Sequence, residues 1–215
     1  GDEIIVSDME HHSNIVPWQL QQQRKDIKIK VIPFDERGHL QVEKLEEMIT
    51  SRTKLVSVTH VSNTLGTVNP VEEIVRIAHA HNVPVLVDGA QSTPHIKVDV
   101  KKLDVDFFVF SGHKVYGPTG IGVLYGRKEL LEAMPPFMGG GDMVDKVTFA
   151  KTTYAPLPLK YEAGTSNFIG AVGLAKAIEY VEKVGVSAIE MHERAVLNVM
   201  TERLSKIDGL RIYGT

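Results

Sequence analysis

The sequence predicts an α/β fold, in which helices flank a mostly parallel, mixed sheet. Strand-like apolar segments alternate with helix-like segments about every 25 residues, which is typical of βα units. Residues 107–110 are apolar at every position, as expected for a strand buried on both faces. A Gly-Pro-Thr-Gly connection precedes the next apolar run at 123–125. Because this connection is too short for a crossover helix, that strand should be antiparallel to its neighbour.

Five apolar segments predict the parallel strands, at residues 3–7, 28–34, 55–61, 83–87 and 107–110. The second alternates between polar and apolar side chains, which indicates a strand near an edge of the sheet. A polar turn is predicted at residues 35–38. Apolar spacing and a proline at the favoured first position predict helices at 42–49, from Pro70 onward, and at 128–134.

The polar segment at residues 8–14 leads into the first predicted helix. Ser13 and Asn14 are both suitable residues to cap its N-terminus. We expect Trp18 and Leu20 on this helix to point into the core.

The last third of the chain differs from the rest in its residue pattern. Prolines and glycines mark residues 135–167 as a long excursion with little regular structure, of the kind that is usually functional or interfacial. Two helices are predicted next, at 168–184 and 186–207, separated by Gly185. Residues 210–215 read as the first strand of a further unit. The predicted division is a large domain over 1–185, followed by a helix and a strand at 186–215 that lead into a truncated small domain.

Composition excludes several classes of protein. The net charge is −3, so nothing points to a nucleic-acid or membrane-surface partner. No apolar run approaches the roughly 20 residues of a membrane span, and a cytoplasmic location is the default expectation. No partner residues complete a metal site around the paired histidines. The chain contains no cysteine, which excludes disulfides and thiolate chemistry within these residues.

Two charged residues stand directly after buried strands. Asp88 follows residues 83–87, and Lys114 comes shortly after residues 107–110. Ligands of open parallel sheets bind outside the carboxyl ends of the strands. A cofactor with a pyridinium ring needs an acid and a Schiff base needs a lysine, so Asp88 and Lys114 are candidates for that pair. The alternatives are a capping or loop acid for Asp88 and a surface lysine for Lys114.

Other polar residues near strand ends extend the candidate site. Ser111 and His113 are suited to holding a phosphate, and Gln91 is placed within one turn of Asp88. The imidazole of His11 is a flat ring that can stack and can also carry a proton. Asn63 ends another strand, and Thr165 lies on the long excursion. For each of these residues, ordinary strand-end, turn or capping hydrogen bonds are the alternative.

Several motifs of this chain together resemble those of a known family. They are Met9-Glu-His-His-Ser-Asn-Ile-Val-Pro-Trp18, Thr59-His-Val-Ser-Asn63, Val87-Asp-Gly-Ala-Gln91, Phe110-Ser-Gly-His-Lys-Val-Tyr-Gly-Pro-Thr-Gly-Ile-Gly122, Gly139-Gly-Gly141 and Glu162-Ala-Gly-Thr165. With them, nearly the whole chain resembles the large domain of a cysteine desulfurase of the SufS type, within the class V aminotransferase family. The resemblance implies a homodimer of fold type I that depends on pyridoxal 5′-phosphate (PLP).

The resemblance also implies a role for each candidate. PLP would be bound to Lys114, with Asp88 on the ring nitrogen and Gln91 on the phenolic oxygen. His11 would stack on the ring, and Ser111 and His113 would hold the phosphate. Two further residues are implied beside the cofactor: Asn63, next to cofactor and substrate, and Thr165, which would reach the neighbouring subunit's site together with the loop Gly139–Gly141.

The implied activity is removal of sulfur from L-cysteine to give L-alanine and an enzyme persulfide for iron–sulfur cluster assembly, with a SufE- or SufU-like acceptor protein. Two departures stand against it: the family's Thr-Pro is Thr-Ser at Thr165, and these residues include neither the nucleophilic cysteine nor the substrate-binding arginine region of the family. Selenocysteine lyase, kynureninase, a true transaminase, and an inactive fragment that only binds PLP or dimerises remain alternatives.

Overall fold

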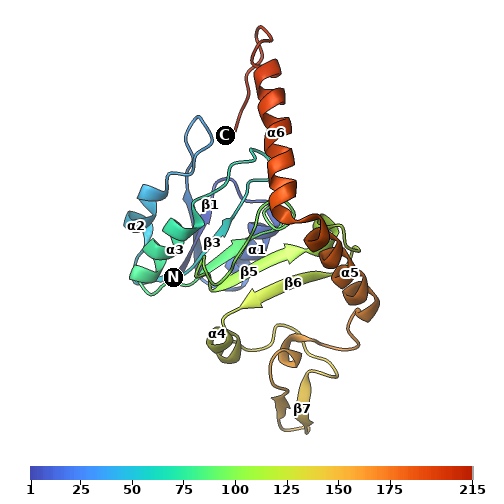
Figure 1. The fold of residues 1–215 in the computed structure, drawn as a ribbon. Helices are drawn as coiled ribbons and strands as arrows, with labels where there is room; N and C mark the ends of the chain where they lie inside the picture. Colours follow the sequence, from blue (N-terminus) through green and yellow to red (C-terminus); the bar gives the residue numbers. More distant parts are fainter. Residues whose placement is uncertain (215) are drawn as a thin grey trace.

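The structure, a computed structural model that describes residues 1–214, is organised around a six-stranded sheet in the order β2-β1-β3-β4-β5-β6 (Figure 1). Its strands are β1 (Asp2–Ser7), β2 (Ile27–Ile32), β3 (Thr53–Thr59), β4 (Val85–Asp88), β5 (Phe107–Ser111) and β6 (Gly122–Gly126). The first five strands are parallel, and β6 is antiparallel to β5. The predicted mixed sheet is confirmed, including the edge position of β2 and the reversed direction of β6.

The central strands are apolar because both of their faces are covered. Ile5, Val56, Val58, Val85 and Val87 are all fully buried. On β5 the prediction holds only for the first half of the strand: its first two phenylalanines are buried, whereas residues 109–111 are half-buried. The reason is that a pocket opens over the end of this strand.

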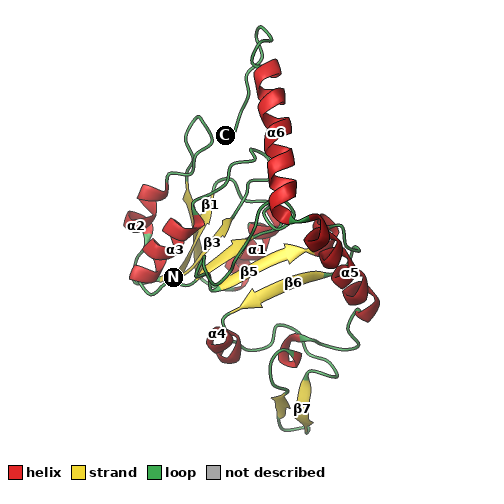
Figure 2. Cartoon of the chain, viewed as in Figure 1, coloured by secondary structure: helices red, strands yellow, loops and turns green. Residues whose placement is uncertain are grey.

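Helices lie on both faces of the sheet, as Figure 2 shows. They are α1 (Val16–Arg24), α2 (Leu45–Met48), α3 (Val71–Ala80), α4 (Lys128–Ala133), α5 (Phe168–Val184) and α6 (Val186–Leu204), with 3-10 helices η1 (His12–Asn14), η2 (Val42–Lys44), η3 (Gly112–Val115) and η4 (Leu159–Tyr161). α2 and α3 lie together on one face, and α1 lies on the other (Figure 1). No helix within residues 1–214 is both long enough and apolar enough to cross a membrane.

The predictions for α1 were wrong in two respects. Neither Ser13 nor Asn14 caps this helix, because the side chain of Asn14 is bound inside a buried polar cluster instead. Leu20 does not point into the core and is 44% exposed. Residues two apart on a helix cannot face the same side, and here Trp18 is half-buried while Leu20 shares the exposed face of Val16.

The excursion at residues 135–167 contains a hairpin that the sequence analysis did not predict, formed by β7 (Val144–Val147) and β8 (Thr152–Tyr154). The break between α5 and α6 is confirmed, with Gly185 in the left-handed region at a φ of 87°. α6 has no buried residue and projects from the body (Figure 1). The strand predicted at 210–215 was wrong for residues 210–214, which lie in no strand, and Thr215 lies outside the described residues.

Glu3, at the start of β1, joins three strands at the edge of the sheet that faces away from the pocket. Its Oε2 accepts hydrogen bonds from Thr50 Oγ1 at 2.6 Å and Thr53 Oγ1 at 3.2 Å, and pairs with Lys30 Nζ at 2.8 Å. The Lys30 contact and then the Thr50 hydroxyl lower the pKa of Glu3 from 4.5 to about 2. Between pH 4.5 and about pH 2, the folded state therefore keeps this carboxylate ionised, whereas the unfolded chain takes up a proton there.

We expect Glu3→Gln to remove part of the acid sensitivity of the protein. Because the folded pKa is depressed, the stabilisation by Glu3 is fully present above the unfolded value of 4.5 and is lost as pH falls towards about 2. The difference in unfolding free energy between wild type and variant should therefore be largest near neutrality and shrink over this range. Urea unfolding at a series of pH values measures it, with the exposed Glu43→Gln as control. A difference that does not change with pH would contradict the assignment.

Candidate active site

The carboxyl ends of β1, β4 and β5 surround a pocket of about 410 Å³. This is the edge of the sheet at which parallel α/β folds bind ligands. Five of the predicted site residues line the pocket: His11, Asp88, Ser111, His113 and Lys114. The structure brings these side chains together from three separate segments, and their individual roles stay predictions.

Asp88 is the last residue of β4 and is only 8% exposed. Its Oδ1 accepts a hydrogen bond from the N–H of Ala90 at 2.9 Å. The residue between them has to be glycine: a Cβ on Gly89 would lie 1.8 Å from Cζ of Phe108. The ring of Phe108 therefore packs against the bare backbone, which fixes the turn that presents the Asp88 carboxylate.

Lys114 lies in η3, directly after β5, and its side chain is half-buried. The turn depends on Gly112, whose N–H donates to Ile121 O at 2.9 Å and whose Cβ, if present, would meet Ile121 Cγ2 at 2.9 Å. Within residues 1–214, Lys114 Nζ makes no hydrogen bond or ion pair. The amine is thus held beside the pocket without a structural partner.

His11 lies at the start of η1 with an exposed side chain. The Ser13 N–H donates to His11 Nδ1 at 3.2 Å, and the Ser13 hydroxyl lies 2.8 Å from the same atom. Since Nδ1 accepts from the backbone, the neutral ring carries its proton on Nε2. The ring of His12 lies 5.9 Å away, between centroids, at an interplanar angle of 29°.

Three predicted residues do not line the pocket. Gln91 is half-buried in the turn after Asp88, Asn63 is exposed after the end of β3, and Thr165 is exposed before α5. Contacts of these residues with a cofactor, a substrate or a second subunit stay predictions.

A buried polar cluster beside the pocket was missed by the sequence analysis. Asn14 lines the pocket and is 6% exposed, and its Nδ2 donates to Glu10 Oε2 at 2.7 Å. Asn14 Oδ1 accepts from Ser57 Oγ at 2.7 Å and from Trp18 Nε1 at 3.2 Å. A signal was available: Ser57 and Thr59 place two polar side chains on one face of an otherwise apolar central strand, where they need buried partners.

Comparison with known proteins gives a consistent result. The chain matches the family described as aminotransferase class-V over residues 1–215. It is 51% identical to a cysteine desulfurase of Synechococcus elongatus over 215 residues, covering 100% of this chain and 34% of that protein. The cysteine desulfurase CsdA from Escherichia coli has a TM-score of 0.93 and 42% identity, covering 97% of this chain and 52% of that chain. The apo cysteine desulfurase from Thermococcus onnurineus has a TM-score of 0.94 and 40% identity, covering 100% and 54%.

A more distant structure is a mutant of C-DES with glycine covalently linked to its PLP cofactor. It is 27% identical, has a TM-score of 0.87, and covers 97% of this chain and 56% of that chain. The chain spans about a third to about half of the length of the curated relatives it matches.

Proposed function

The chain belongs to the class V aminotransferase family and is a homologue of cysteine desulfurases, and from this membership we propose that it binds PLP as part of an enzyme that removes sulfur from L-cysteine. The products would be L-alanine and an enzyme persulfide. A SufE- or SufU-like protein would accept the persulfide sulfur for iron–sulfur cluster assembly. In this proposal residues 1–185 form the cofactor-binding domain, and residues 186–215 lead into a second domain.

One observation carries the proposal: an amine without a partner and a buried carboxylate line the same pocket. Asp88 is 8% exposed, and among the described residues only its Oδ1 receives a hydrogen bond. Lys114 lies in η3 and lines the same pocket. Its Nζ makes no hydrogen bond or ion pair within residues 1–214. A buried charge is costly without a partner or a chemical use, so both groups point to a ligand.

The residues present suit PLP. An acid, an amine and an imidazole line a pocket of about 410 Å³, within the usual range for small-ligand sites. Ser111 and His113 supply polar donors at the end of β5 for a phosphate. The amide of Gln91 lies in the turn after Asp88, where we assign it to the phenolic oxygen.

When bound, PLP supplies an electron-accepting ring that stabilises negative charge at the substrate Cα. Asp88 would keep a proton on the ring nitrogen, because its carboxylate favours the cationic form of a neighbouring base. Lys114 would hold the cofactor covalently and then take the Cα proton of L-cysteine as a general base. His11 would cover the ring and hold or move a proton at Nε2, and Asn63 would bind near the substrate.

A homodimer is part of the proposal. Large apolar side chains are exposed on the excursion and on α5: Phe137 is 87% exposed, Phe149 fully exposed, Phe168 63%, Ile169 74% and Val172 71%. Phe168, Ile169 and Val172 are near neighbours in the first turns of α5, and contiguous exposed apolar surface marks interaction surfaces. We assign them to a second copy of the chain, whose site Thr165 and the loop Gly139–Gly141 would reach.

Covalent labelling tests the proposal. The chain is saturated with PLP, reduced with borohydride, digested and mapped by mass spectrometry. The label should be found on Lys114, and a label on any other lysine would remove the assignment.

We expect this chain, loaded with PLP, to form no protein-bound persulfide from L-cysteine. Sulfur transfer needs an enzyme thiolate, and these 215 residues contain no cysteine. A soluble thiol could accept the sulfur instead, but slowly, because it lacks the proximity of a tethered group. Intact mass and alanine production are measured with and without added thiol. Fast alanine formation that needs no thiol would show that another group accepts the sulfur.

A further inference from the structure

Glu10 is a buried acid next to the pocket that none of these roles uses. It is 7% exposed. Its Oε1 accepts from the N–H of Thr59 at 2.7 Å and from the hydroxyl of Ser7, and its Oε2 accepts from Nδ2 of Asn14 at 2.7 Å. The three donors come from the end of β1, the end of β3 and η1, so one carboxyl group ties three segments together.

Two of these donors connect Glu10 to residues that line the pocket, His11 and Asp88. The N–H of Asn14 donates to His11 O at 2.8 Å, so the residue that Glu10 holds also fixes the His11 backbone. Thr59 is the register partner of Asp88 on the neighbouring strand. His60, the first residue after β3, donates its N–H to Asp88 O at 2.9 Å.

The charge of Glu10 is also coupled to the pocket. Burial raises the pKa of Glu10 above its ordinary value, the hydrogen bonds from Ser7, Asn14 and Thr59 lower it in part, and the charge of Asp88 raises it. The pKa of Glu10 therefore depends on the charge of Asp88, which lines the pocket.

We propose that Glu10 is a positioning residue of the candidate active site: by joining Asn14 to Thr59, its carboxyl group sets the position of His11 relative to Asp88. The inference rests on the proposed function only for the ligand of the pocket. The hydrogen-bond network itself is independent of that ligand.

The substitution Glu10→Gln tests the network with almost no change in volume. A carboxylate accepts from both sides, whereas an amide has one oxygen and one NH₂ group. Either orientation of the amide turns a donor towards Thr59 N or Asn14 Nδ2. Flipping Asn14 does not relieve the conflict, because its NH₂ group would then face the indole N–H of Trp18.

Trp18 provides a direct readout, because it is the only tryptophan of the chain and its Nε1 donates to Asn14 Oδ1 at 3.2 Å. Glu10→Gln should shift the Trp18 emission to longer wavelength, because displacement of Asn14 frees the half-buried indole N–H to bond to water. The double substitution Glu10→Gln with Asn14→Asp should restore it, since position 14 then accepts on both sides.

Glu3→Gln is the matched control. Glu3 lies near the start of β1, whereas Glu10 follows the end of that strand. Glu3 is 8% exposed and is also held by three groups, but it has no contact with the pocket. A general loss of stability would act alike in both variants. A positioning role acts only in Glu10→Gln.

The experiment measures Trp18 emission in the PLP-free chain and the dissociation constant for PLP in wild type, Glu10→Gln, Glu3→Gln and the double variant. We expect Glu10→Gln to bind PLP about tenfold more weakly, the effect of one conflicting buried hydrogen bond, and to shift the emission. Glu3→Gln should keep the wild-type emission and an affinity within about twofold, and the double variant should recover the wild-type emission.

Two results would overturn the proposal: an unchanged emission and affinity in Glu10→Gln, or equal weakening by Glu3→Gln. Failure of the double variant to recover the emission, including failure to fold, would count against it too. If the wild-type chain binds no PLP, the proposed function fails, whereas the emission series still decides whether Glu10 holds Asn14 in place.

Discussion

Lys114→Ala should abolish covalent attachment of PLP and reduce exchange of the substrate Cα proton by roughly 10²–10⁴-fold, the usual contribution of a positioned general base. Proton exchange from L-cysteine or L-alanine into deuterated water, followed by NMR, isolates this step, because it requires no enzyme thiol. Folding should be little affected: within residues 1–214, Lys114 Nζ makes no hydrogen bond or ion pair, so its removal leaves no orphaned partner.

The control for Lys114→Ala is Lys102→Ala. Lys102 is a surface lysine whose Nζ lies 3.4 Å from Glu72 Oε1. This variant should retain both the borohydride label and the exchange rate. If Lys114→Ala exchanged protons within a few-fold of wild type, the base would have to be another group lining the pocket.

The second large effect is expected for Asp88→Asn. An amide cannot keep a ring nitrogen protonated, so proton exchange should fall by roughly 10²–10³-fold, as when one preorganised electrostatic group is removed. Folding should be largely spared, because the amide oxygen can still accept from the N–H of Ala90. Near-normal exchange in this variant would show that Asp88 is not the partner of the ring nitrogen.

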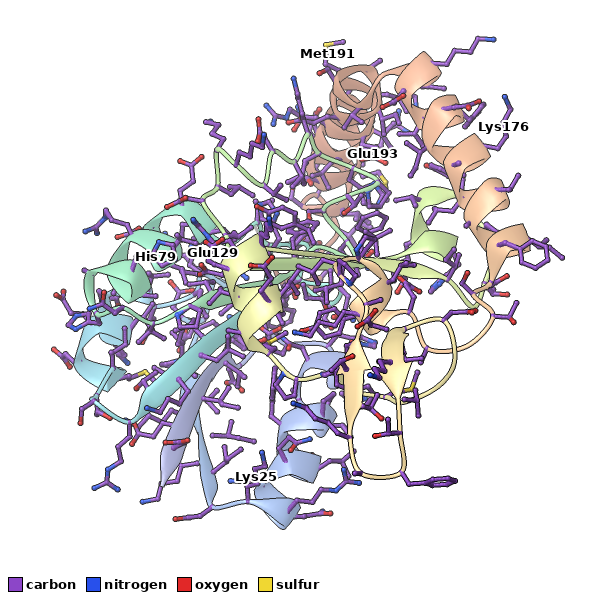
Figure 3. The ribbon with its side chains drawn as sticks, turned by 90° about the horizontal axis from the view of Figure 1, so that it is seen from below. Lys25, His79, Glu129, Lys176, Met191 and Glu193 are labelled. Atoms are coloured by element: carbon purple, nitrogen blue, oxygen red, sulfur yellow. The ribbon has the colours of Figure 1, made fainter. Side chains whose placement is uncertain are left out.

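Asp106→Asn is the matched control, since Asp106 is a second buried aspartate, 6% exposed, that directly precedes β5 at the edge of the sheet away from the pocket. Its carboxylate is held by the N–H of Val85 at 2.7 Å, by His79 Nε2 at 2.8 Å and by Arg127 Nε at 2.9 Å. His79 lies on α3, in the outer part of the molecule (Figure 3). This variant should lose stability, because a buried ion pair is broken, while each folded molecule keeps its exchange activity.

The strands of the sheet could be predicted from sequence because β1, β4 and β5 are mostly apolar runs and β2 alternates as an edge strand does. The direction of β6 followed from a connection too short for a helix. The inner face of α1 could not be predicted, since Trp18 and Leu20 are both apolar and only the packing shows which of them faces the sheet. The β7–β8 hairpin was missed because its strands are short and exposed, so they carry no burial pattern.

α6 illustrates the same limit. The helix itself was predicted, but the sequence did not show that none of its residues is buried within the described residues. Glu193 lies on the side of α6 that faces the rest of the molecule and pairs with His95 Nδ1 at 2.8 Å, whereas Met191 lies on the outer side (Figure 3). This contact joins residues far apart in the sequence, which no local pattern reveals.

For the candidate site, residues that directly follow a strand could be predicted, because parallel strands deliver their carboxyl ends to one edge. Asp88, Ser111 and Lys114 belong to this class. The cluster of Glu10 and Asn14 could be signalled but not assembled from the sequence. Polar residues on β3 indicate that buried partners are needed, but only the tertiary structure shows that Glu10 and Asn14 are those partners.

The antiparallel pairing of β5 and β6 has a consequence for the order in which the chain folds. Ser111 pairs with Gly122 across a short connection, so closing this loop costs little entropy, and hairpins form in about 1–10 μs. β1 instead pairs with β2 and β3, which lie much further along the chain, and such non-local contacts form late. We therefore expect the turn that carries Lys114 to form early, and the segment that carries His11 to join the pocket later.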